Sequence, residues 1–277
     1  MTNHEPMRVP TGIQGLDRML DGGFFEGRLY LLIGNSGSGR STIGGHFLMD
    51  GIQNGEDVLY VAIDSSPTDI NTCMSCFGWD TRKIVILNAH PRVRDYKVRG
   101  SVVEVSSQRT VGAMGEMGEW DKASQQPGTV SSDLSLPTLQ LMLQKELEDR
   151  SYDRILIDSL TALKMFGAEE IQWELGINSI FRLLAEEGAT TLMISDVPRT
   201  LEPVRAEFFL ARGIIRTIRT VVGGKTHRGI FIEKFRGSAH DLHIRPMRIT
   251  PKGVQIDADK TFPPAIMAEI ARQFPRP

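Results

Sequence analysis

The chain has 277 residues, of which 40% are hydrophobic and 24% charged, and its 32 basic and 34 acidic residues give a net charge of −2. This is the composition of an ordinary globular protein that is long enough to bury a large core. The near-neutral charge argues against binding to nucleic acid or to an anionic membrane through net charge alone, although it leaves room for a local basic patch. The amino terminus lacks the apolar stretch of a signal peptide, and no apolar run reaches the length of a membrane span, so we expect a cytoplasmic protein with no membrane partner.

Short apolar runs recur along the first two thirds of the chain, and segments with helical periodicity separate them. The predicted strands are residues 28–34, 58–64, 83–89, 154–160 and 190–195. The predicted helices are residues 41–54, a helix that begins near residue 67, and residues 138–149 and 170–187. Continuous apolar strands that alternate with helices are typical of a parallel sheet covered on both faces.

After Gly213 the pattern changes, because "GIIRTIRTV", "RGIFIEKF" and "MRITPKGVQID" indicate strands without helices between them, the last with a hairpin turn at 251–253. We therefore predict a single α/β domain over residues 1–277, with a mostly parallel central sheet and antiparallel strands at the C-terminal end. Residues 264–274 predict a short helix with Ile266, Ile270 and Phe274 on one face, which docks on its own domain or on a partner.

Two further features have no assigned role. Residues 90–136 lack clear periodicity, and since such a stretch is uncommon inside a compact domain we interpret it as a flexible insertion, with a functional lid as the alternative and 101–105 as a candidate strand. Cys73 and Cys76 form a C-x-x-C motif, but no second cysteine pair completes a zinc site. If they lie on one helix they share a face, and we expect core packing rather than a redox or metal role.

The stretch "GNSGSGRS" has the spacing of a phosphate-binding loop, with Arg40 where a lysine is usual. It follows a predicted strand and opens a predicted helix, which is the context in which backbone N–H groups converge on phosphate oxygens at a helix N-terminus. The predicted nucleotide-binding residues are Gly34, Asn35, Ser36, Gly37, Ser38, Gly39, Arg40 and Ser41.

Two oxygen-bearing side chains are predicted to hold a Mg²⁺ ion. The hydroxyl of Ser41 would contact the ion directly. Asp158 ends the apolar strand in "ILIDS" and would hold the ion through water. A carboxylate at a strand end is ordinary on its own, but together with the loop it predicts ATP or ADP with Mg²⁺ as the cofactors.

The segment "VPTGIQGLDRMLDGGFFEGRLYLLIGNSGSGRS" resembles the opening of KaiC-type ATPases of the RecA superfamily. "VLYVAIDSSPTDI", "ILIDSLTAL" and "IEKFRGSAH" are similar to later blocks of that family in order and spacing. The resemblance covers about residues 9–257, apart from 90–136. It implies a RecA-like P-loop NTPase fold, ATP as ligand, and a homo-oligomeric ring, with a hexamer as the expectation. It also implies that Lys234 and Arg236, in the K-x-R-G position, act in trans on the γ-phosphate bound by a neighbouring subunit.

The departures from the family pattern concern catalysis. Asp64 and Ser65 occupy positions where the family has two adjacent glutamates, the first of which polarises the attacking water. Arg40 replaces the loop lysine with a bulkier planar guanidinium. We therefore expect Asp64 to be a poor catalytic residue and any Mg²⁺-dependent ATP hydrolysis to be slow or absent.

Three functions fit these observations to different degrees. We favour a KaiC-like ATP-binding protein that acts as a nucleotide-dependent regulatory or assembly module, with a regulatory protein partner left open. The first alternative is a competent ATPase, or a kinase that acts on itself or on a partner. The second is a RecA-like DNA-binding recombination factor, for which residues 93–100 ("VRDYKVRG") are only a faint candidate.

Overall fold

The computed structural model describes residues 7–89, 135–165, 170–196 and 206–273. All of these belong to one compact unit of the chain. The candidate strand 101–105, the basic segment 93–100 and nearly all of the predicted insertion lie outside the described residues. The single-domain prediction therefore stays a prediction.

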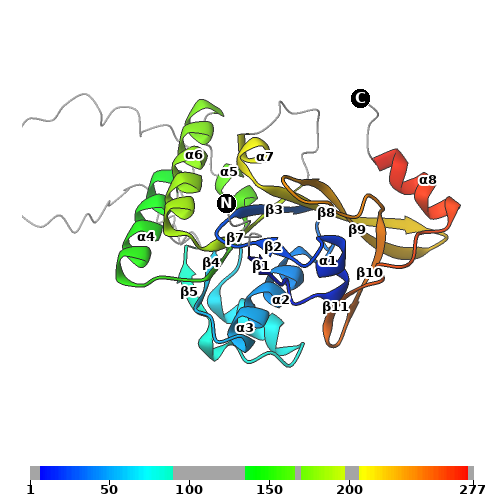
Figure 1. Ribbon diagram of the computed structural model, residues 1–277, viewed down its shortest axis with the longest axis horizontal. Coiled ribbons are helices and arrows are strands. Elements are labelled where there is room, and N and C mark those ends of the chain that lie inside the picture. Colours follow the sequence, from blue (N-terminus) through cyan, green and yellow to red (C-terminus); the bar gives the residue numbers. More distant parts are fainter. Residues whose placement is uncertain (1–6, 90–134, 166–169, 197–205, 274–277) are drawn as a thin grey trace, which may run out of the picture. The chain divides into compact units, whose positions relative to one another are not determined.

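Nine strands form one mixed sheet in the order β11-β10-β9-β8-β3-β7-β6-β4-β5 (Figure 1). The strands from β8 to β5 in this order are mutually parallel. Their bounds are β3 Leu29–Gly34, β4 Val58–Ala62, β5 Val85–Asn88, β6 Arg154–Asp158, β7 Thr190–Asp196 and β8 Gly213–Val222. Three more strands extend the sheet antiparallel from β8, namely β9 Lys225–Phe235, β10 Arg245–Thr250 and β11 Gly253–Ile256. The short strands β1 Arg8–Val9 and β2 Phe24–Phe25 pair separately.

Helices cover both faces of this sheet. The described helices are α1 Gln14–Met19, α2 Arg40–Gln53, α3 Pro67–Ser75, α4 Leu136–Asp149, α5 Leu160–Met165, α6 Glu170–Glu187, α7 Ala206–Leu210 and α8 Pro264–Gln273, with a 3-10 turn η1 at Thr81–Lys83. Helices α1, α2 and α3 pack on one face, where they bury Tyr30 and Leu32. Helices α4 and α6 pack on the other, where they bury Leu31 and Ile33. Because neighbouring residues of one strand enter opposite cores, the parallel strands are continuously apolar.

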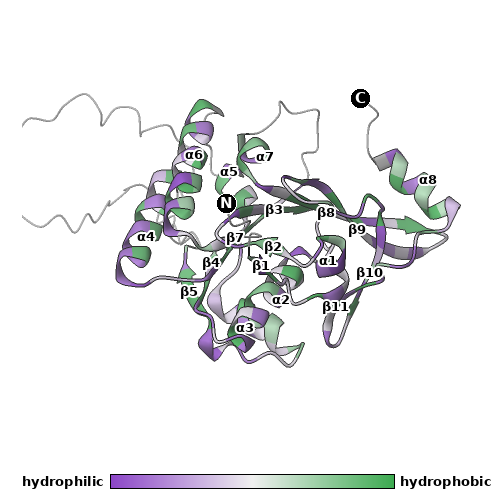
Figure 2. Ribbon diagram, in the orientation of Figure 1, coloured by the Kyte–Doolittle hydropathy of each residue, from purple (hydrophilic) through white to green (hydrophobic). Residues whose placement is uncertain are grey.

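The hydropathy pattern agrees with this layering. In Figure 2 the strands at the β8–β10 end of the sheet carry hydrophilic as well as hydrophobic residues, and α4, α6 and α8 also show both kinds along their lengths. Such a mixture is typical of a helix with one face on a core and the other in water. Among the described residues, no helix combines the length and the apolar character needed to cross a membrane.

Helix α2 lies unusually close to the sheet because it contains glycines. A Cβ on Gly44 would lie 2.7 Å from the side chain of Leu156 in β6, and one on Gly51 would lie 2.9 Å from Arg154. Glycine inside a helix costs about 1 kcal/mol relative to alanine. Close contact of α2 with β6 offsets this cost and fixes the helix that follows the predicted phosphate loop.

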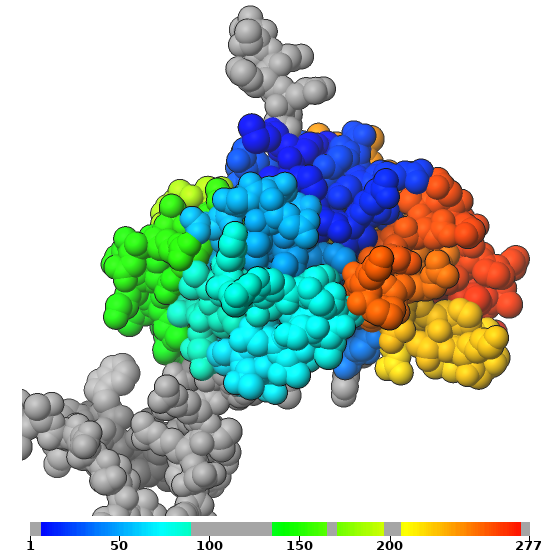
Figure 3. Space-filling view, turned by 90° about the horizontal axis from the view of Figure 1, so that it is seen from below, coloured from blue at the N-terminus to red at the C-terminus, as the bar shows by residue number. Residues whose placement is uncertain are grey.

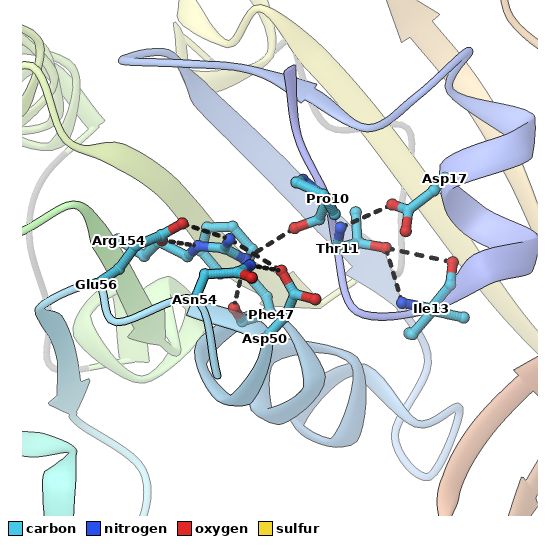
Figure 4. A network of polar contacts seen from close by, with 9 residues as sticks. All are labelled: Pro10, Thr11, Ile13, Asp17, Phe47, Asp50, Asn54, Glu56 and Arg154. Carbon is cyan, nitrogen blue, oxygen red and sulfur yellow. Dashed lines mark hydrogen bonds and ion pairs between the residues drawn. The ribbon is translucent and has the colours of Figure 1, made fainter. Parts of the chain in front are cut away.

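A buried arginine ties three segments together at the amino end of β6 (Figure 4). Arg154 is completely buried. Its guanidinium forms a bidentate ion pair with Glu56, a 2.9 Å contact with Asp50, and 2.8 Å hydrogen bonds to the carbonyl oxygens of Pro10 and Phe47. These contacts use all five N–H donors of the side chain. Arg154 thereby fastens the segment before α1 to the C-terminal half of α2.

The same network continues into the N-terminal segment. The backbone N–H of Thr11 donates to the Asp17 carboxylate at 2.7 Å (Figure 4). Burial raises the pKa of Asp17 above its ordinary value, against the lowering effect of this hydrogen bond. The Thr11–Asp17 pair closes the turn that leads into α1.

The structure confirms the predicted fold class and corrects several details. The predicted strand 154–160 ends at Asp158, and α5 begins at Leu160. The prediction that Cys73 and Cys76 pack in the core is wrong, because both thiols are free and exposed. Helix α3 instead buries Ile70 and Met74, four residues apart.

The C-terminal helix docks on its own domain. Ile270 is buried with Ile218 and Phe262, and Ile266 packs against the same small cluster. Phe274, the third predicted contact, lies outside the described residues. The alternative use of this helix face by a partner is therefore not needed to explain its apolar pattern.

Candidate nucleotide-binding site

The predicted site residues gather at the carboxyl ends of four neighbouring strands. The strands β3, β7, β6 and β4 lie side by side in the sheet. β3 leads into the loop from Gly34 to Ser41, β7 ends at Asp196, β6 ends at Asp158, and Asp64 follows β4 by two residues. This edge is where open parallel α/β sheets bind ligands.

The loop has the backbone that a phosphate cradle requires. β3 ends at Gly34 and α2 begins at Arg40. Gly37 and Gly39 have φ angles of 73° and 102°, in the left-handed region that side chains rarely adopt. With glycine at both positions, the backbone N–H groups turn toward a common centre at the N-terminus of α2.

The side chain of Ser38 attaches the loop to strand β8. Its hydroxyl is buried and lies 2.7 Å from the hydroxyl of Thr217 in β8. Thr217 in turn donates to the carbonyl oxygen of Ile33 at 3.2 Å. A Cβ on Gly34 would collide with both hydroxyl groups. The side chain of Ser38 therefore holds the loop in place, and only its backbone faces a ligand.

Ser41 and Asp158 lie close together. Both line one pocket, and the buried Asp158 carboxylate accepts a 2.8 Å hydrogen bond from Tyr60. Burial raises the pKa of Asp158, and its interactions with Ser41 and Tyr60 oppose the shift. A hydroxyl and a carboxylate are the oxygen ligands that Mg²⁺ prefers, so the pair fits the predicted ion.

Within the described part of the chain, no three His, Cys, Asp or Glu side chains are grouped to hold a metal ion by themselves. Tyr60, which orients Asp158, was not predicted, and no sequence signal distinguishes it from an ordinary buried tyrosine.

Arg40 is bound to the end of β7. Its guanidinium donates to the carbonyl oxygen of Ser195 at 2.6 Å and forms an ion pair with Asp196. The Arg40 side chain is only 13% exposed. Asp196 was missed, although "TTLMISD" ends in a carboxylate just as "RILID" does. The ion pair directs Arg40 toward the sheet edge.

Asp64 lies at the rim of the site. Its carboxylate accepts a 2.6 Å hydrogen bond from the hydroxyl of Ser159. Desolvation raises the pKa of Asp64, and the nearby carboxylates of Asp158 and Asp196 add to the rise. Asp64 and Asp158 therefore belong to one electrostatically coupled group.

Two arginines that were not predicted lie beside the loop. Arg228 donates to the carbonyl oxygen of Gly37 at 3.0 Å. A Cβ on Gly37 would lie 3.2 Å from the guanidinium of Arg219. Arg219 and Arg228 face each other across β8 and β9. Two like charges in this arrangement are unfavourable unless an anion is near, which suits a phosphate loop.

Comparison with known proteins agrees with this geometry. The family model of the KaiC ATPases matches residues 9–261. The chain belongs to the KaiC ATPase family. It therefore has the RecA-type P-loop NTPase fold of that family, and family membership supports nucleotide binding.

The relatives span nearly the whole chain. A UPF0273 protein of Pyrococcus furiosus is 30% identical over 92% of this chain and 96% of its own length. The circadian clock protein KaiC3 of Synechocystis is 27% identical over 90% of this chain, which matches 45% of KaiC3. In structure, a KaiC-like protein of Pyrococcus horikoshii aligns with a TM-score of 0.69 and 23% identity over 91% of this chain and 100% of that one.

Lys234 and Arg236 lie away from the loop of their own chain. Lys234 pairs with Ile214 near the start of β8, whereas the loop follows the carboxyl end of β3, to which β8 is parallel. Arg236 is exposed and follows β9 by one residue. The structure thus brings together the loop, Asp158 and Asp64, and leaves the K-x-R pair at the opposite edge of the sheet.

Lys234 has contacts of its own. Its ammonium group donates to the carbonyl oxygens of Phe208 and Phe209, at 2.5 and 3.3 Å, at the end of α7. Partial burial lowers the pKa of Lys234, and the charge of Arg236 lowers it further. The two cations are therefore close enough to repel each other, as the spacing predicted.

Proposed function

We propose that this member of the KaiC family binds ATP or ADP with Mg²⁺ through Gly34–Ser41 and Asp158. The observation that carries this proposal is the placement of Ser41 beside the buried carboxylate of Asp158 at the end of a glycine-shaped loop. The loop would hold the phosphates, and Ser41 would contact the ion. When bound, Mg²⁺ would neutralise phosphate charge in a site that already holds three carboxylates.

In this proposal the protein acts as a nucleotide-dependent regulatory or assembly module, and its hydrolysis is slow or absent. Arg40 must leave Asp196 and Ser195 before it can reach a phosphate. The Asp64 carboxylate is shorter than a glutamate and is engaged by Ser159. Ser65 has no group that can accept a proton from water at neutral pH. Each of these features weakens catalysis without removing the phosphate cradle.

Calorimetric titration with MgATP and MgADP, together with a phosphate-release assay on the same sample, tests the proposal. We expect saturable binding of both nucleotides with turnover far below about 1 per second, the low end of ordinary enzyme rates. Absence of binding would contradict the nucleotide site. Binding with fast phosphate release would instead identify a competent ATPase.

We further propose that nucleotide stabilises a homo-oligomeric ring, with a hexamer as the expected form, and that Lys234 and Arg236 act in trans. Their position away from their own loop supports this role, because only the loop of another copy is then available. Phe209 and Leu210 in α7 are exposed beside Lys234. An apolar surface next to two cations suits contact with a second copy.

Light scattering with and without MgATP tests the assembly. Arg236→Ala is the cleanest variant, because Arg236 is exposed and its loss leaves the contact between Lys234 and α7 intact. We expect it to reduce nucleotide-dependent assembly, and Lys234→Ala to add to the loss. The exposed cations Lys252 and Arg272 provide a control double alanine variant that should assemble like wild type. A wild-type protein that stays monomeric with bound MgATP would overturn the trans role.

A further inference from the structure

A pocket of about 160 Å³ lies between the first turn of α2, strand β4 and helix α3. It is lined by Ser41, Thr42, Tyr60, Ser65, Asp69, Ile70, Cys73, Met74, Phe77, Trp79 and Asp158. An apolar cavity of about 150 Å³ accommodates one benzene ring. The volume therefore suits a ligand built on a single ring.

The pocket adjoins the proposed phosphate loop and shares Ser41 with it. None of residues 34–40 lines the pocket. It extends from Ser41 and Asp158 along α3 to Phe77 and Trp79. Trp79 is held from behind by His46 and by the turn at Gly253, so this end of the pocket has a fixed wall. Figure 3 shows α3 and the segment after it (cyan) beside the β10–β11 hairpin (orange).

The lining combines apolar and acidic groups. It contains two aromatic rings, a thioether and Ile70, together with the carboxylates of Asp69 and Asp158, which accept hydrogen bonds from Ser66 and Tyr60. No lysine, arginine or histidine lines the pocket. Aromatic faces attract cations, and carboxylates pair with them. An anionic or purely apolar ligand fits this lining less well than a cation with a ring.

We propose that this pocket binds a small arylalkyl amine in its protonated form, with its ring against Phe77 and Trp79 and its ammonium group paired with the carboxylates of Asp69 and Asp158. Because Ser41 and Asp158 are shared with the Mg²⁺ site, the amine and the Mg²⁺–nucleotide complex exclude each other. The pocket is thus a regulatory site through which a metabolite of this class would release the nucleotide. Binding of the amine itself needs no nucleotide, so it is tested independently of the proposed function.

The two cysteines provide an internal reporter and its control. Cys73 lines the pocket, whereas Cys76 does not, and both thiols are exposed. In the Cys76→Ser variant iodoacetamide labels only Cys73, and in the Cys73→Ser variant only Cys76. The rate of labelling is followed by intact-protein mass spectrometry in Mg²⁺-free buffer while benzylamine is titrated.

We expect benzylamine at about ten times its dissociation constant to slow the labelling of Cys73 about tenfold, as mass action requires for a blocked thiol. The labelling of Cys76 should not change. Benzyl alcohol, which has the same ring without the charge, should protect less. No protection of Cys73, equal protection of both thiols, or equal protection by the alcohol would each overturn the proposal.

A charge variant sharpens the test. Asp69→Asn should weaken benzylamine binding about fivefold, the upper range for an exposed ion pair, whereas Asp149→Asn, at the exposed end of α4, should have no effect. The titration is repeated with protein to which calorimetry has shown that MgADP is bound. The benzylamine concentration that halves the rate of Cys73 labelling should then be severalfold higher. An Asp69→Asn variant with unchanged affinity would overturn the placement of the ammonium group, and an unchanged midpoint in MgADP would overturn the shared use of Ser41 and Asp158.

Discussion

The two edges of the parallel sheet differ in how their charged side chains are paired. At the amino edge, Arg154 is completely buried and all five of its donors have acceptors, including the carboxylates of Asp50 and Glu56. At the carboxyl edge, the coupled carboxylates of Asp64 and Asp158 lie with Asp196 near Arg40.

The difference separates structural charge from functional charge. A buried arginine whose N–H donors are all hydrogen-bonded cannot also bind a ligand. Its removal would leave its acceptors without those hydrogen bonds in a poorly solvated site. Burial raises the pKa of Asp64, and the excess negative charge of three carboxylates around one guanidinium raises it further. The Mg²⁺ ion that we propose for this edge would offset that charge. Helix α2 joins the two edges, since it begins at Arg40 and carries Asp50.

The largest effect is expected at the amino edge. Arg154→Met should lower the free energy of unfolding by about 3–5 kcal/mol, because it removes all five hydrogen bonds of the guanidinium and leaves the partly buried carboxylates of Asp50 and Glu56 without their cation. Urea denaturation measures the change. The exposed Arg272→Met variant should change it by less than about 0.5 kcal/mol. A loss below about 1 kcal/mol for Arg154→Met would show that the network is not structural.

Gly37→Val should abolish nucleotide binding at the carboxyl edge. The valine would adopt a φ of 73° only with strain and would stand in the phosphate path beside Arg219. We expect the affinity for MgATP to fall at least about 100-fold, or about 2.7 kcal/mol, by calorimetry. Gly55→Val is a matched control, because Gly55 also has positive φ but open space around it. Equal loss in both variants would mean that strain, and not the loop, is responsible.

The pH dependence of stability tests whether His46, in the helix α2 that joins the two edges, is buried in its neutral form. His46 in α2 accepts a 2.8 Å hydrogen bond from the N–H of Val254, and burial lowers the pKa of His46 to about 4. The unfolded chain, with an ordinary histidine pKa of 6.5, therefore binds the proton more readily. Stability should be constant above about pH 6.5 and should decrease as the pH falls to about 4, by about 3 kcal/mol.

Urea titrations at several pH values measure this decrease. His46→Gln keeps an acceptor for Val254 but does not titrate, so its stability should depend less on pH across the same interval. If wild type and His46→Gln lose stability in parallel, the protonation of His46 does not contribute.

The smallest expected effect concerns catalysis at the carboxyl edge. Asp64→Glu combined with Ser65→Glu should raise the rate of phosphate release about tenfold, part of what a general base contributes. Arg40→Lys alone should change the rate less than about twofold, because the base would still be missing. A larger gain from Arg40→Lys than from the double glutamate variant would show that release of Arg40 from Asp196 limits the reaction.

The periodicity of the chain predicted the strands of the nine-stranded sheet and five of the eight described helices, but not the short elements β1, β2, α1, α5 and α7. The helix predicted at 170–187 coincides with α6, Glu170–Glu187. Hydrophobic pattern is a local property that burial on one or two faces imposes, and it can therefore be read without knowledge of the fold. The cysteines show its limit, since a shared helix face does not reveal whether that face is the buried one.

The sequence by itself determined the strand, loop and helix that form the proposed phosphate loop, because its glycines, Ser41 and the flanking strand and helix are contiguous. It also placed Asp158 and Asp64, which end or follow apolar strands. Only the tertiary structure decided which strands are neighbours, and so which charges meet: Arg40 with Asp196, Tyr60 with Asp158, and Arg154 with Asp50 and Glu56. These partners are separated by up to 156 positions along the chain, between Arg40 and Asp196. No local pattern encodes such pairs, because strand order in the sheet depends on the packing of the whole core.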